Sequence, residues 1–311
     1  MNKNLNFIYC FDQSYKLQAF TSVVSLLENL NEKINLHFVV DNNNISYKIP
    51  EFIKNHRMLN KLEIKVFKDN DFFFPNLDNV HVSKATYYRM FLENYIPNEV
   101  SEAIYVDADT VFVKNPINAI KFNLKVLLDS NKIISARTEQ YFTDNIEIDK
   151  FERLNINTSY FNAGVMLINL KLWKQVEFTK ELIQNMNKLT TKIIQWDQDV
   201  LNSTLNGSYV ELQKELNFNS NNYKKDMDDV ILIHFIGSKK PWNTSGAFNY
   251  SSNFYHEYYS LFSKNNFHIN HIWIRASILE LVKGVITLKI LKLNNPLKYL
   301  IDFFKSLKLK I

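Results

Sequence analysis

The first part of the chain alternates short apolar runs with segments of helical periodicity, and this alternation constrains the fold of the 311 residues most strongly. Apolar runs at residues 7–10, 36–40, 62–67 and 103–106 predict buried strands. Between the first two runs, apolar residues recur at helical spacing over residues 17–30. Strands joined by helices require crossover connections, so the sequence predicts an α/β fold with a mostly parallel sheet.

Later segments extend this pattern as far as residue 234. Further strands are predicted at residues 132–136, 165–169 and 231–234. Helices are predicted near residues 52–59, 84–95, 116–122 and 178–188, with another opening at 196. Residues 137–159 are polar and show no clear period, so we expect an irregular lid over the site.

Aspartates stand where three of the predicted strands end, namely at Asp12, Asp41 and Asp107. Ligands of open α/β sheets bind beyond the carboxyl ends of the strands. We therefore expect the functional site at this edge of the sheet.

The most informative strand end is Asp107-Ala108-Asp109. Alternation along an extended strand would direct both carboxylates at a common point. Two carboxylates this close repel each other unless a cation lies between them, and hard divalent cations prefer oxygen ligands. The alternative is a pair of solvated turn residues, because Asp-x-Asp is common by chance. The tripeptide alone indicates a metal site without deciding it.

Composition excludes several classes of protein. The chain has five glycines, and none of them forms a Gly-rich phosphate loop, which argues against a P-loop NTPase or a dinucleotide fold. Cys10 is the single cysteine, which excludes an intrachain disulfide and a cysteine-based zinc site and is typical of a reducing compartment. The first apolar run, residues 5–11, is too short and too polar for a signal peptide, so we expect a cytoplasmic protein.

Positive charge is concentrated at the carboxyl end of the chain. Residues 275–311 hold eight Lys or Arg against two acidic residues, a net charge of +6, which leaves about −1 of the total +5 for residues 1–274. We therefore predict a catalytic domain over residues 1–265, without a nucleic-acid partner, and a basic helical tail over residues 266–311.

The tail contains two apolar segments, residues 272–293 and 297–309, that are interrupted by charges such as Glu280 and Lys283. These charges argue against a transmembrane helix. A basic amphipathic helix that binds the anionic inner leaflet of a membrane is the favoured interpretation. The alternative is a helical subdomain that packs on the body.

Four segments occur in the order YVDAD (105–109), YFNAGVMLINL (160–170), WDQDVLN (196–202) and HFIGSKKPW (234–242). Together they resemble glycosyltransferase family 8, which includes bacterial lipopolysaccharide galactosyl- and glucosyltransferases and, more distantly, glycogenin. The likeness covers roughly residues 5–245. It implies a GT-A fold and retaining transfer of a hexose from UDP-galactose or UDP-glucose to a glycan or glycolipid acceptor, with Mn²⁺ or Mg²⁺ on the diphosphate.

The resemblance assigns the metal ligands to Asp107, Asp109 and His234. An imidazole ligand favours Mn²⁺ over Mg²⁺, and the metal would stabilise the leaving UDP. Lys240 matches a family lysine on the diphosphate, and Gly237 would let the backbone approach a phosphate. The alternative for His234 is a structural histidine, and the alternative for Lys240 is a solvated Lys239-Lys240 pair.

The resemblance also assigns donor contacts. Asp12 matches an acidic residue that reads the uracil or ribose, and Arg89 matches an arginine near the sugar and phosphate. The alternative for Arg89 is an exposed helical charge. The complete donor-binding set is Cys10, Asp12, Arg89, Asp107, Ala108, Asn162, Ala163, Gly237 and Lys240.

Asp197 and Gln198 match the family pair below the anomeric carbon and form the predicted catalytic pair. Asp197 would bind sugar hydroxyls, and Gln198 would present its amide oxygen to the developing positive charge. Retaining glycosidases use a carboxylate nucleophile; an amide is a poor nucleophile, which favours a front-face, ion-pair-like substitution. The alternative is a helix N-cap cluster at 197–199, and Asp197 could serve in both roles.

Donor and acceptor identity stay open at this stage. Relatives that use UDP-galactose often carry an Asp after the strand at 132–136, where this chain has Glu139. Acceptor contacts are expected in the loops 69–80 and 137–159. Two other functions remain to be considered: a metal-dependent nucleotidyltransferase, against which the absence of a Gly-rich loop at 7–16 argues, and an inactive sugar-nucleotide-binding relative.

Overall fold

The computed structural model describes residues 4–42, 48–68, 72–75, 77, 83–144, 146–225 and 227–308. Across these residues a seven-stranded sheet runs in the order β3-β2-β1-β4-β7-β6-β8. Its strands are β1 (Asn6–Phe11), β2 (Ile34–Val40), β3 (Leu59–Val66), β4 (Glu102–Val106), β6 (Ile134–Tyr141), β7 (Ser159–Asn169) and β8 (Val210–Glu211). Of the strands in the described part of this sheet, only β7 runs antiparallel to its neighbours, β4 and β6, so the predicted mostly parallel α/β sheet is confirmed.

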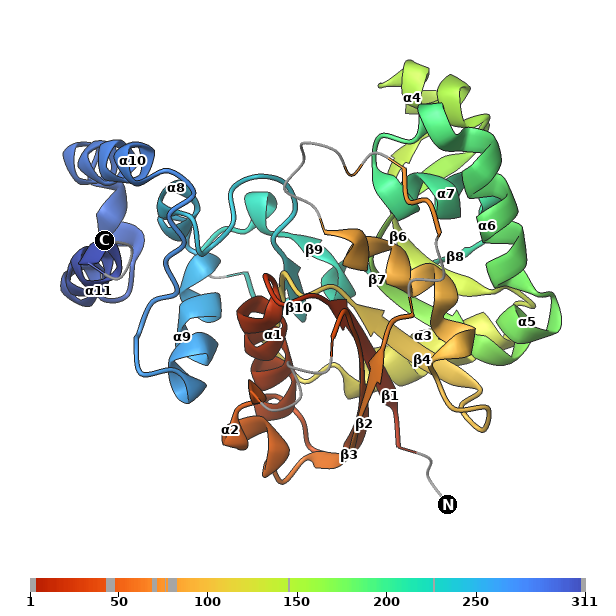
Figure 1. Ribbon diagram of the computed structural model, residues 1–311, viewed down its shortest axis with the longest axis horizontal. Helices are drawn as coiled ribbons and strands as arrows, with labels where there is room; N and C mark the ends of the chain where they lie inside the picture. The colour runs from red at the N-terminus through yellow and green to blue at the C-terminus, as the bar shows by residue number, and fades with distance from the viewer. Residues whose placement is uncertain are drawn as a thin grey trace.

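Helices cover both faces of the sheet because β1 is apolar on both sides. Phe7, Tyr9 and Phe11 face one core, and Ile8 and Cys10 face the other. The first core is closed by α1 (Lys16–Glu28), α2 (Glu51–Lys54), α3 (Ile117–Asp129) and α9 (Ser252–Phe262). The second is closed by the 3₁₀ helix η2 (Lys84–Asn94) with α5 (Leu170–Gln175), α6 (Phe178–Leu189) and α7 (Trp196–Leu205), seen opposite α1 in Figure 1.

A second, three-stranded sheet lies beside the carboxyl end of β4. It consists of β5 (Thr110–Phe112), β10 (Leu232–His234) and β9 (Phe218–Asn219), in the order β5-β10-β9. β5 and β10 are antiparallel, with Thr110 opposite His234. This pairing brings two segments that are more than a hundred residues apart in sequence to one place.

Two predictions of secondary structure were wrong. The predicted irregular lid at 137–159 contains the end of β6, the turn η3 (Phe142–Asp144), α4 (Ile148–Leu154) and the start of β7. The sequence did not predict the second half of β6, because the residues at its buried positions, Thr138 and Gln140, are polar. The helix predicted at 52–59 ends at Lys54, because residues from Leu59 onward pair with β2. Most of the loop 69–80 lies outside the described residues.

The carboxyl-terminal tail packs on the body. It contains α10 (Ile274–Ile286), η7 (Lys289–Lys292) and α11 (Pro296–Lys308), which lie beyond α8 (Thr244–Ala247) at one extremity of the molecule (Figure 1). A small core joins the tail to Phe248, against which Tyr299 packs edge-on at 5.5 Å between ring centroids. Among the described residues, no helix is long and apolar enough to cross a membrane. Three further short 3₁₀ helices lie in the body: η4 (Thr190–Lys192), η5 (Lys214–Leu216) and η6 (Ser220–Asn222).

Candidate active site

The candidate site lies where the order of the strands changes direction. β2 and β3 extend from one side of β1, whereas β4 lies on the other side, and ligands of α/β sheets bind at such a switch point. Asp12 and Asp107 follow these two central strands. Asp12 Oδ1 accepts hydrogen bonds from the backbone N–H groups of Ser14 (2.9 Å) and Tyr15 (3.1 Å), so it shapes the turn into α1.

Asp107, Asp109 and His234 converge as the sequence predicted. Each offers a ligand atom, and these atoms all lie within 4.8 Å of one another. The reason for the convergence differs from the predicted one. β4 ends at Val106, and a tight turn over 107–109, not an extended strand, directs both carboxylates inward. The backbone N–H of Phe235 donates to Asp109 O at 2.9 Å, which fixes the turn against β10.

Asn217 orients the His234 ring. Its Oδ1 lies 2.9 Å from His234 Nδ1, while His234 Nε2 lies 3.3 Å from Asp109 Oδ1. Asn217 Nδ2 donates to Asn162 Oδ1 at 3.0 Å, so its oxygen is the atom that faces the ring. With the proton on Nδ1, the Nε2 lone pair is directed at the carboxylates, where a metal ion would bind. Sequence reasoning missed Asn217, because no pattern marks an asparagine just before a two-residue strand.

Gly164 lets two of the candidate ligands, His234 and Asp107, approach each other. A Cβ at this position would lie 2.1 Å from His234 Cε1 and 2.9 Å from Asp107 Oδ2. The backbone is tied to the same place, since the N–H of Asp107 donates to Gly164 O at 2.7 Å. Two carboxylates and one imidazole of fixed tautomer, around a space that only glycine leaves free, fit a divalent ion such as Mn²⁺.

Lys240 neutralises one of these carboxylates. Its Nζ lies 2.5 Å from Asp109 Oδ2 and 2.5 Å from Phe235 O. Burial raises the pKa of Asp109, but the Lys240 ammonium and the neighbouring His234 ring outweigh burial and hold the pKa well below its usual range. The predicted phosphate lysine therefore lies against the candidate metal site. Gly237 has a φ of +83°, and an added Cβ would meet no atom within 4 Å, so the backbone is open there.

Arg89 links the candidate metal ligand Asp107 to Asp197 of the predicted catalytic pair. It is 5% exposed, so the alternative of an exposed helical charge is wrong. Its Nη1 lies 3.1 Å from Asp107 Oδ1, and its Nε lies 2.7 Å from Asp197 Oδ2. The guanidinium also stacks 4.6 Å from the centre of the Tyr105 ring. Burial lowers the pKa of Arg89, but the two carboxylates outweigh it and raise the pKa above its usual value.

Asp197 and Gln198 lie at the first turn of α7. Asp197 is 1% exposed, and its Oδ1 accepts a hydrogen bond from Thr86 Oγ1 at 2.5 Å. Burial raises the pKa of Asp197 to about 6 against the opposing charge of Arg89, so the carboxylate is mostly ionised at neutral pH. Gln198 Oε1 accepts from the backbone N–H of Ala163 at 3.0 Å. Asp197 also accepts a hydrogen bond from its own backbone N–H, in the first turn of α7.

Asp199 ties the loop before α7 to the first turn of that helix. Its Oδ2 accepts hydrogen bonds from the backbone N–H groups of Ile194 (2.8 Å) and Gln195 (2.9 Å), in the loop that leads into α7. The alternative of an N-cap cluster at 197–199 therefore describes Asp199, and Asp197 shares in it through its own backbone N–H. Asp197 is turned toward Arg89, and Gln198 toward β7.

The remaining predicted donor residues lie around this centre. Asn162 Nδ2 donates to Glu139 Oε1 at 2.9 Å, so a chain of hydrogen bonds runs from Glu139 through Asn162 and Asn217 to His234. Ala108 is 8% exposed within the 107–109 turn. Cys10 is 7% exposed and packs in the core, and burial raises the pKa of its thiol.

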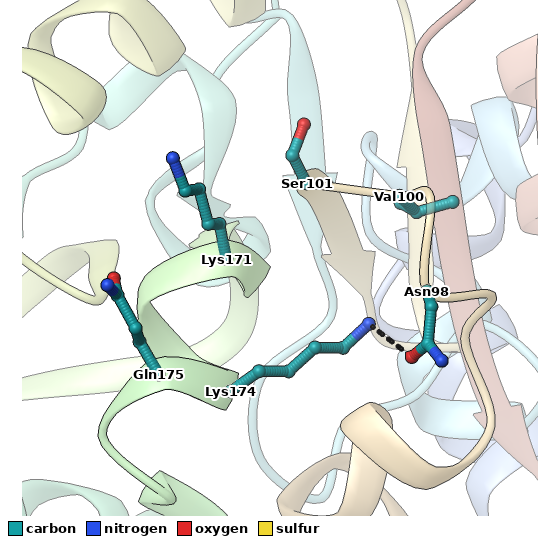
Figure 2. Close-up of a pocket in the computed structure, with 6 residues that line it drawn as sticks. All are labelled: Asn98, Val100, Ser101, Lys171, Lys174 and Gln175. Carbon is teal, nitrogen blue, oxygen red and sulfur yellow. Dashed lines mark hydrogen bonds between the residues drawn. The ribbon is translucent and has the colours of Figure 1, made fainter.

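A separate cavity of about 420 Å³ lies away from this centre (Figure 2). Its lining includes Ser101, which precedes β4, whereas Asp107 follows the same strand at the opposite end. Lys174 of α5 reaches across it and donates to Asn98 Oδ1 at 3.4 Å. None of the predicted site residues lines this cavity.

Comparison with known families agrees with this geometry. The family model of "Glycosyl transferase family 8" matches residues 6–246, which is most of the chain and includes every predicted site residue. The chain belongs to glycosyl transferase family 8. Membership in this glycosyltransferase family excludes the nucleotidyltransferase alternative.

Curated relatives of this family 8 chain include sugar transferases of lipopolysaccharide. The lipopolysaccharide 1,2-glucosyltransferase of Escherichia coli K12 is 27% identical over 259 residues, covering 77% of this chain and 73% of the relative. The lipopolysaccharide 1,3-galactosyltransferase of Salmonella typhimurium is 27% identical over 191 residues, covering 55% and 52%. General stress protein A of Bacillus subtilis is 22% identical over 273 residues, covering 81% and 92%.

Among solved structures, galactosyltransferase LgtC in complex with donor and acceptor sugar analogs superposes with a TM-score of 0.72. It is 20% identical, and the match covers 88% of this chain and all of LgtC. The glycosyltransferase GlyE of Streptococcus pneumoniae in its apo form gives a TM-score of 0.63 at 18% identity, covering 84% of this chain and 62% of GlyE. These likenesses confirm the predicted GT-A fold.

Proposed function

We propose that this family 8 glycosyltransferase is a metal-dependent, retaining enzyme that moves galactose or glucose from a UDP-sugar to a glycan or glycolipid acceptor. The observation that carries the proposal is the convergence of Asp107, Asp109 and His234, joined through Arg89 to Asp197. Relatives that are named for lipopolysaccharide galactosyl and glucosyl transfer support a role in cell-surface glycan synthesis.

In this mechanism Asp107, Asp109 and His234 would hold Mn²⁺, or Mg²⁺ less well. When bound, the ion supplies positive charge that stabilises the diphosphate leaving group. Asn217 would accept the hydrogen bond of His234 Nδ1 and so direct Nε2 at the site, and Gly164 leaves room for the ligands. Lys240 lies in the same segment as Gly237 and would offer its ammonium group to a phosphate oxygen, while the open backbone at Gly237 accommodates the phosphate.

The sugar side of the mechanism depends on Asp197 and Gln198. The N–H of Ala163 fixes the Gln198 amide, whose oxygen would face the positive charge that develops at the anomeric carbon. The ionised Asp197 holds Arg89 and would accept a hydrogen bond from a sugar hydroxyl. Since the amide is a poor nucleophile, the acceptor oxygen would attack from the face that UDP leaves, which retains the configuration.

The direct test is UDP release by the full-length protein with Mn²⁺ and either UDP-galactose or UDP-glucose, with and without EDTA. We expect turnover with one of them, loss of turnover in EDTA, and a product whose anomeric configuration by NMR matches the donor. No UDP release with any UDP-sugar would favour an inactive sugar-nucleotide-binding relative instead.

Gln198→Ala tests the catalytic pair. Because Gln198 is assigned to the transition state and not to the diphosphate, we expect UDP-sugar turnover to fall about 100-fold or more while the Kd of UDP measured by calorimetry stays close to that of the wild type. Unchanged turnover would remove Gln198 from the mechanism. An equal loss of UDP affinity would show that it serves donor binding.

Donor choice is proposed to involve Glu139. Its hydrogen bond to Asn162 connects it to the donor side of the site and, through Asn217, to His234. Glu139→Asp shortens the side chain by one methylene and would withdraw the carboxylate from Asn162. We therefore expect this change to alter the ratio of UDP-galactose to UDP-glucose turnover.

We further propose that the tail holds the protein on an anionic membrane surface at the cytoplasmic face of the inner membrane. One side of the tail packs on Phe248, but its other side exposes large apolar side chains, including Ile286 (75% exposed) and Leu297 (74%). Lysines such as Lys283 and Lys298 lie beside them. Apolar side chains with flanking lysines are typical of helices that lie in a membrane interface.

Removing residues 271–311 would uncover Phe248, so point substitutions are the cleaner test. Ile286→Glu with Leu297→Glu should reduce sedimentation with vesicles that contain phosphatidylserine by about tenfold or more. Phe122→Glu, on the exposed side of α3 (59% exposed), is the matched control and should not alter it. Equal sedimentation of all three proteins would mean that the tail serves packing alone.

A further inference from the structure

A cleft of about 570 Å³ opens where the tail meets the catalytic domain. Its walls come from η6, the 236–239 segment, the connection between α8 and α9, and η7 of the tail. Ten described residues line it; two of them are lysines and none is acidic. Its volume falls in the range of small-molecule sites, and a sugar with one or two rings would fit.

The tail supplies one of the two lysines, Lys292, and the body holds it in place. Asn253 of α9 donates from Nδ2 to Lys292 O at 2.8 Å and accepts at Oδ1 from the backbone N–H of Asn294 at 2.9 Å. The Lys292 ammonium lies 5.3 Å from the centre of the Tyr250 ring. This cation is therefore attached to the cleft wall on a fixed backbone.

The second lysine, Lys239, stands beside Lys240 but differs from it in its contacts. Lys240 is paired with Asp109, whereas Lys239 is exposed on the cleft. Within the described residues, neither Lys239 nor Lys292 forms an ion pair with a carboxylate. Two uncompensated ammonium groups in a cleft whose described lining includes no acidic residue favour an anionic ligand.

The cleft is distinct from the donor side of the site. Of the residues proposed to contact the donor, Gly237 alone lines it. Gly237 follows His234 by three residues, so the cleft adjoins the candidate metal site through one short segment. This is the arrangement that a second substrate needs, close to the leaving group but held by different side chains.

We infer that the cleft binds the acceptor, and that the acceptor carries a phosphate group that is bound by Lys239 and Lys292. The inference rests on the proposed transfer from a UDP-sugar and adds the chemical class of the acceptor, a phosphorylated sugar. Asn221, Tyr250 and neighbouring hydroxyl and amide groups of the wall bind its sugar hydroxyls. The tail then forms part of the acceptor site in addition to its proposed role in holding the protein on the membrane surface.

The test compares acceptors that differ in charge alone. Full-length protein with Mn²⁺ and the UDP-sugar that it turns over is given hexose 1-phosphate, hexose 6-phosphate or the matching neutral methyl glycosides. We expect a phosphorylated acceptor to have the lower KM. Lys292→Gln and Lys239→Gln should each raise that KM about tenfold or more, since each removes a charge-assisted hydrogen bond. The neutral sugar lacks the phosphate, so its KM should rise much less in both variants.

Lys289→Gln is the matched control, because Lys289 lies in the same short helix but does not line the cleft. Calorimetry with UDP separates the two phosphate sources. A loss of UDP affinity in Lys292→Gln would assign the cleft to the donor diphosphate and overturn the inference. Equal KM values for charged and neutral acceptors would also overturn it.

The inference and the proposed function fail differently. Hydrolysis of the UDP-sugar without acceptor reports on the proposed function alone, and its absence would not touch the cleft. In that case calorimetry measures the binding of hexose 6-phosphate to the wild type, Lys292→Gln and Lys289→Gln. Binding that is weakened by Lys292→Gln alone supports an anionic ligand in the cleft. Absence of binding to the wild type refutes the anionic ligand. Vesicles that carry a lipid-linked sugar phosphate, compared with the free sugar phosphate, show which of the two sources is preferred.

Discussion

Replacing Gly164 by alanine should abolish the metal site while leaving the fold intact. The added Cβ would lie 2.1 Å from His234 Cε1. Non-bonded carbon atoms pack at about 3.5–4.0 Å, so the ring must retreat by about 1.5 Å. Metal–ligand distances tolerate only about 0.2 Å. The His234 ligand is therefore lost, and the affinity for Mn²⁺ should fall by about 100-fold or more, since weaker second-shell changes already cost about 10–100-fold.

The assay is titration of the UDP-free protein with Mn²⁺, with free Mn²⁺ followed by electron paramagnetic resonance. Overpacking costs about 1–3 kcal/mol, less than the usual stability of a domain, so Gly164→Ala should still unfold cooperatively. Gly237→Ala is the control: its Cβ meets nothing within 4 Å, but its φ of +83° introduces a comparable backbone penalty without touching His234. Wild-type Mn²⁺ affinity in a folded Gly164→Ala protein would refute the assignment.

Two further predictions concern neighbouring residues. Asn217→Ala removes the acceptor that fixes His234 Nδ1, so Mn²⁺ affinity should fall about 10–100-fold in the same titration, whereas the exposed Asn222→Ala should match the wild type. Asp197 has a folded pKa of about 6 against an ordinary value of 3.8, so the folded state holds its proton more tightly than the unfolded chain does. Its contribution to the free energy of unfolding is therefore fully present below pH 3.8 and is lost as pH rises through about 6. Asp197→Asn should remove this slope, worth about 3 kcal/mol, in urea unfolding measured at pH 4, 5, 6 and 7; parallel pH dependences of wild type and variant would contradict it.

The sequence by itself determined the type of fold and the chemistry of the site's centre. Apolar runs alternating with helical segments are enough to predict a mostly parallel sheet, because burial on both faces leaves a continuous apolar signal such as residues 7–10. The ordered segments around Asp107, Gln198 and His234 indicated the family that the family model confirms, since each places an unusual polar cluster beside a short apolar run.

Tertiary structure alone decided how these residues are held. Asn217 and Gly164 contact His234 from segments 17 and 70 residues away along the chain, and such contacts leave no local pattern in the sequence. The strand at 137–141 was hidden because hydrogen-bonded polar side chains replace apolar ones in its buried positions. The sequence likewise favoured a separate amphipathic segment for the tail. In the structure the tail packs on Phe248, and Lys292 lies on the wall of a cleft beside Gly237. Local spacing records which face of an element is apolar; which distant segment that face meets depends on the folded chain.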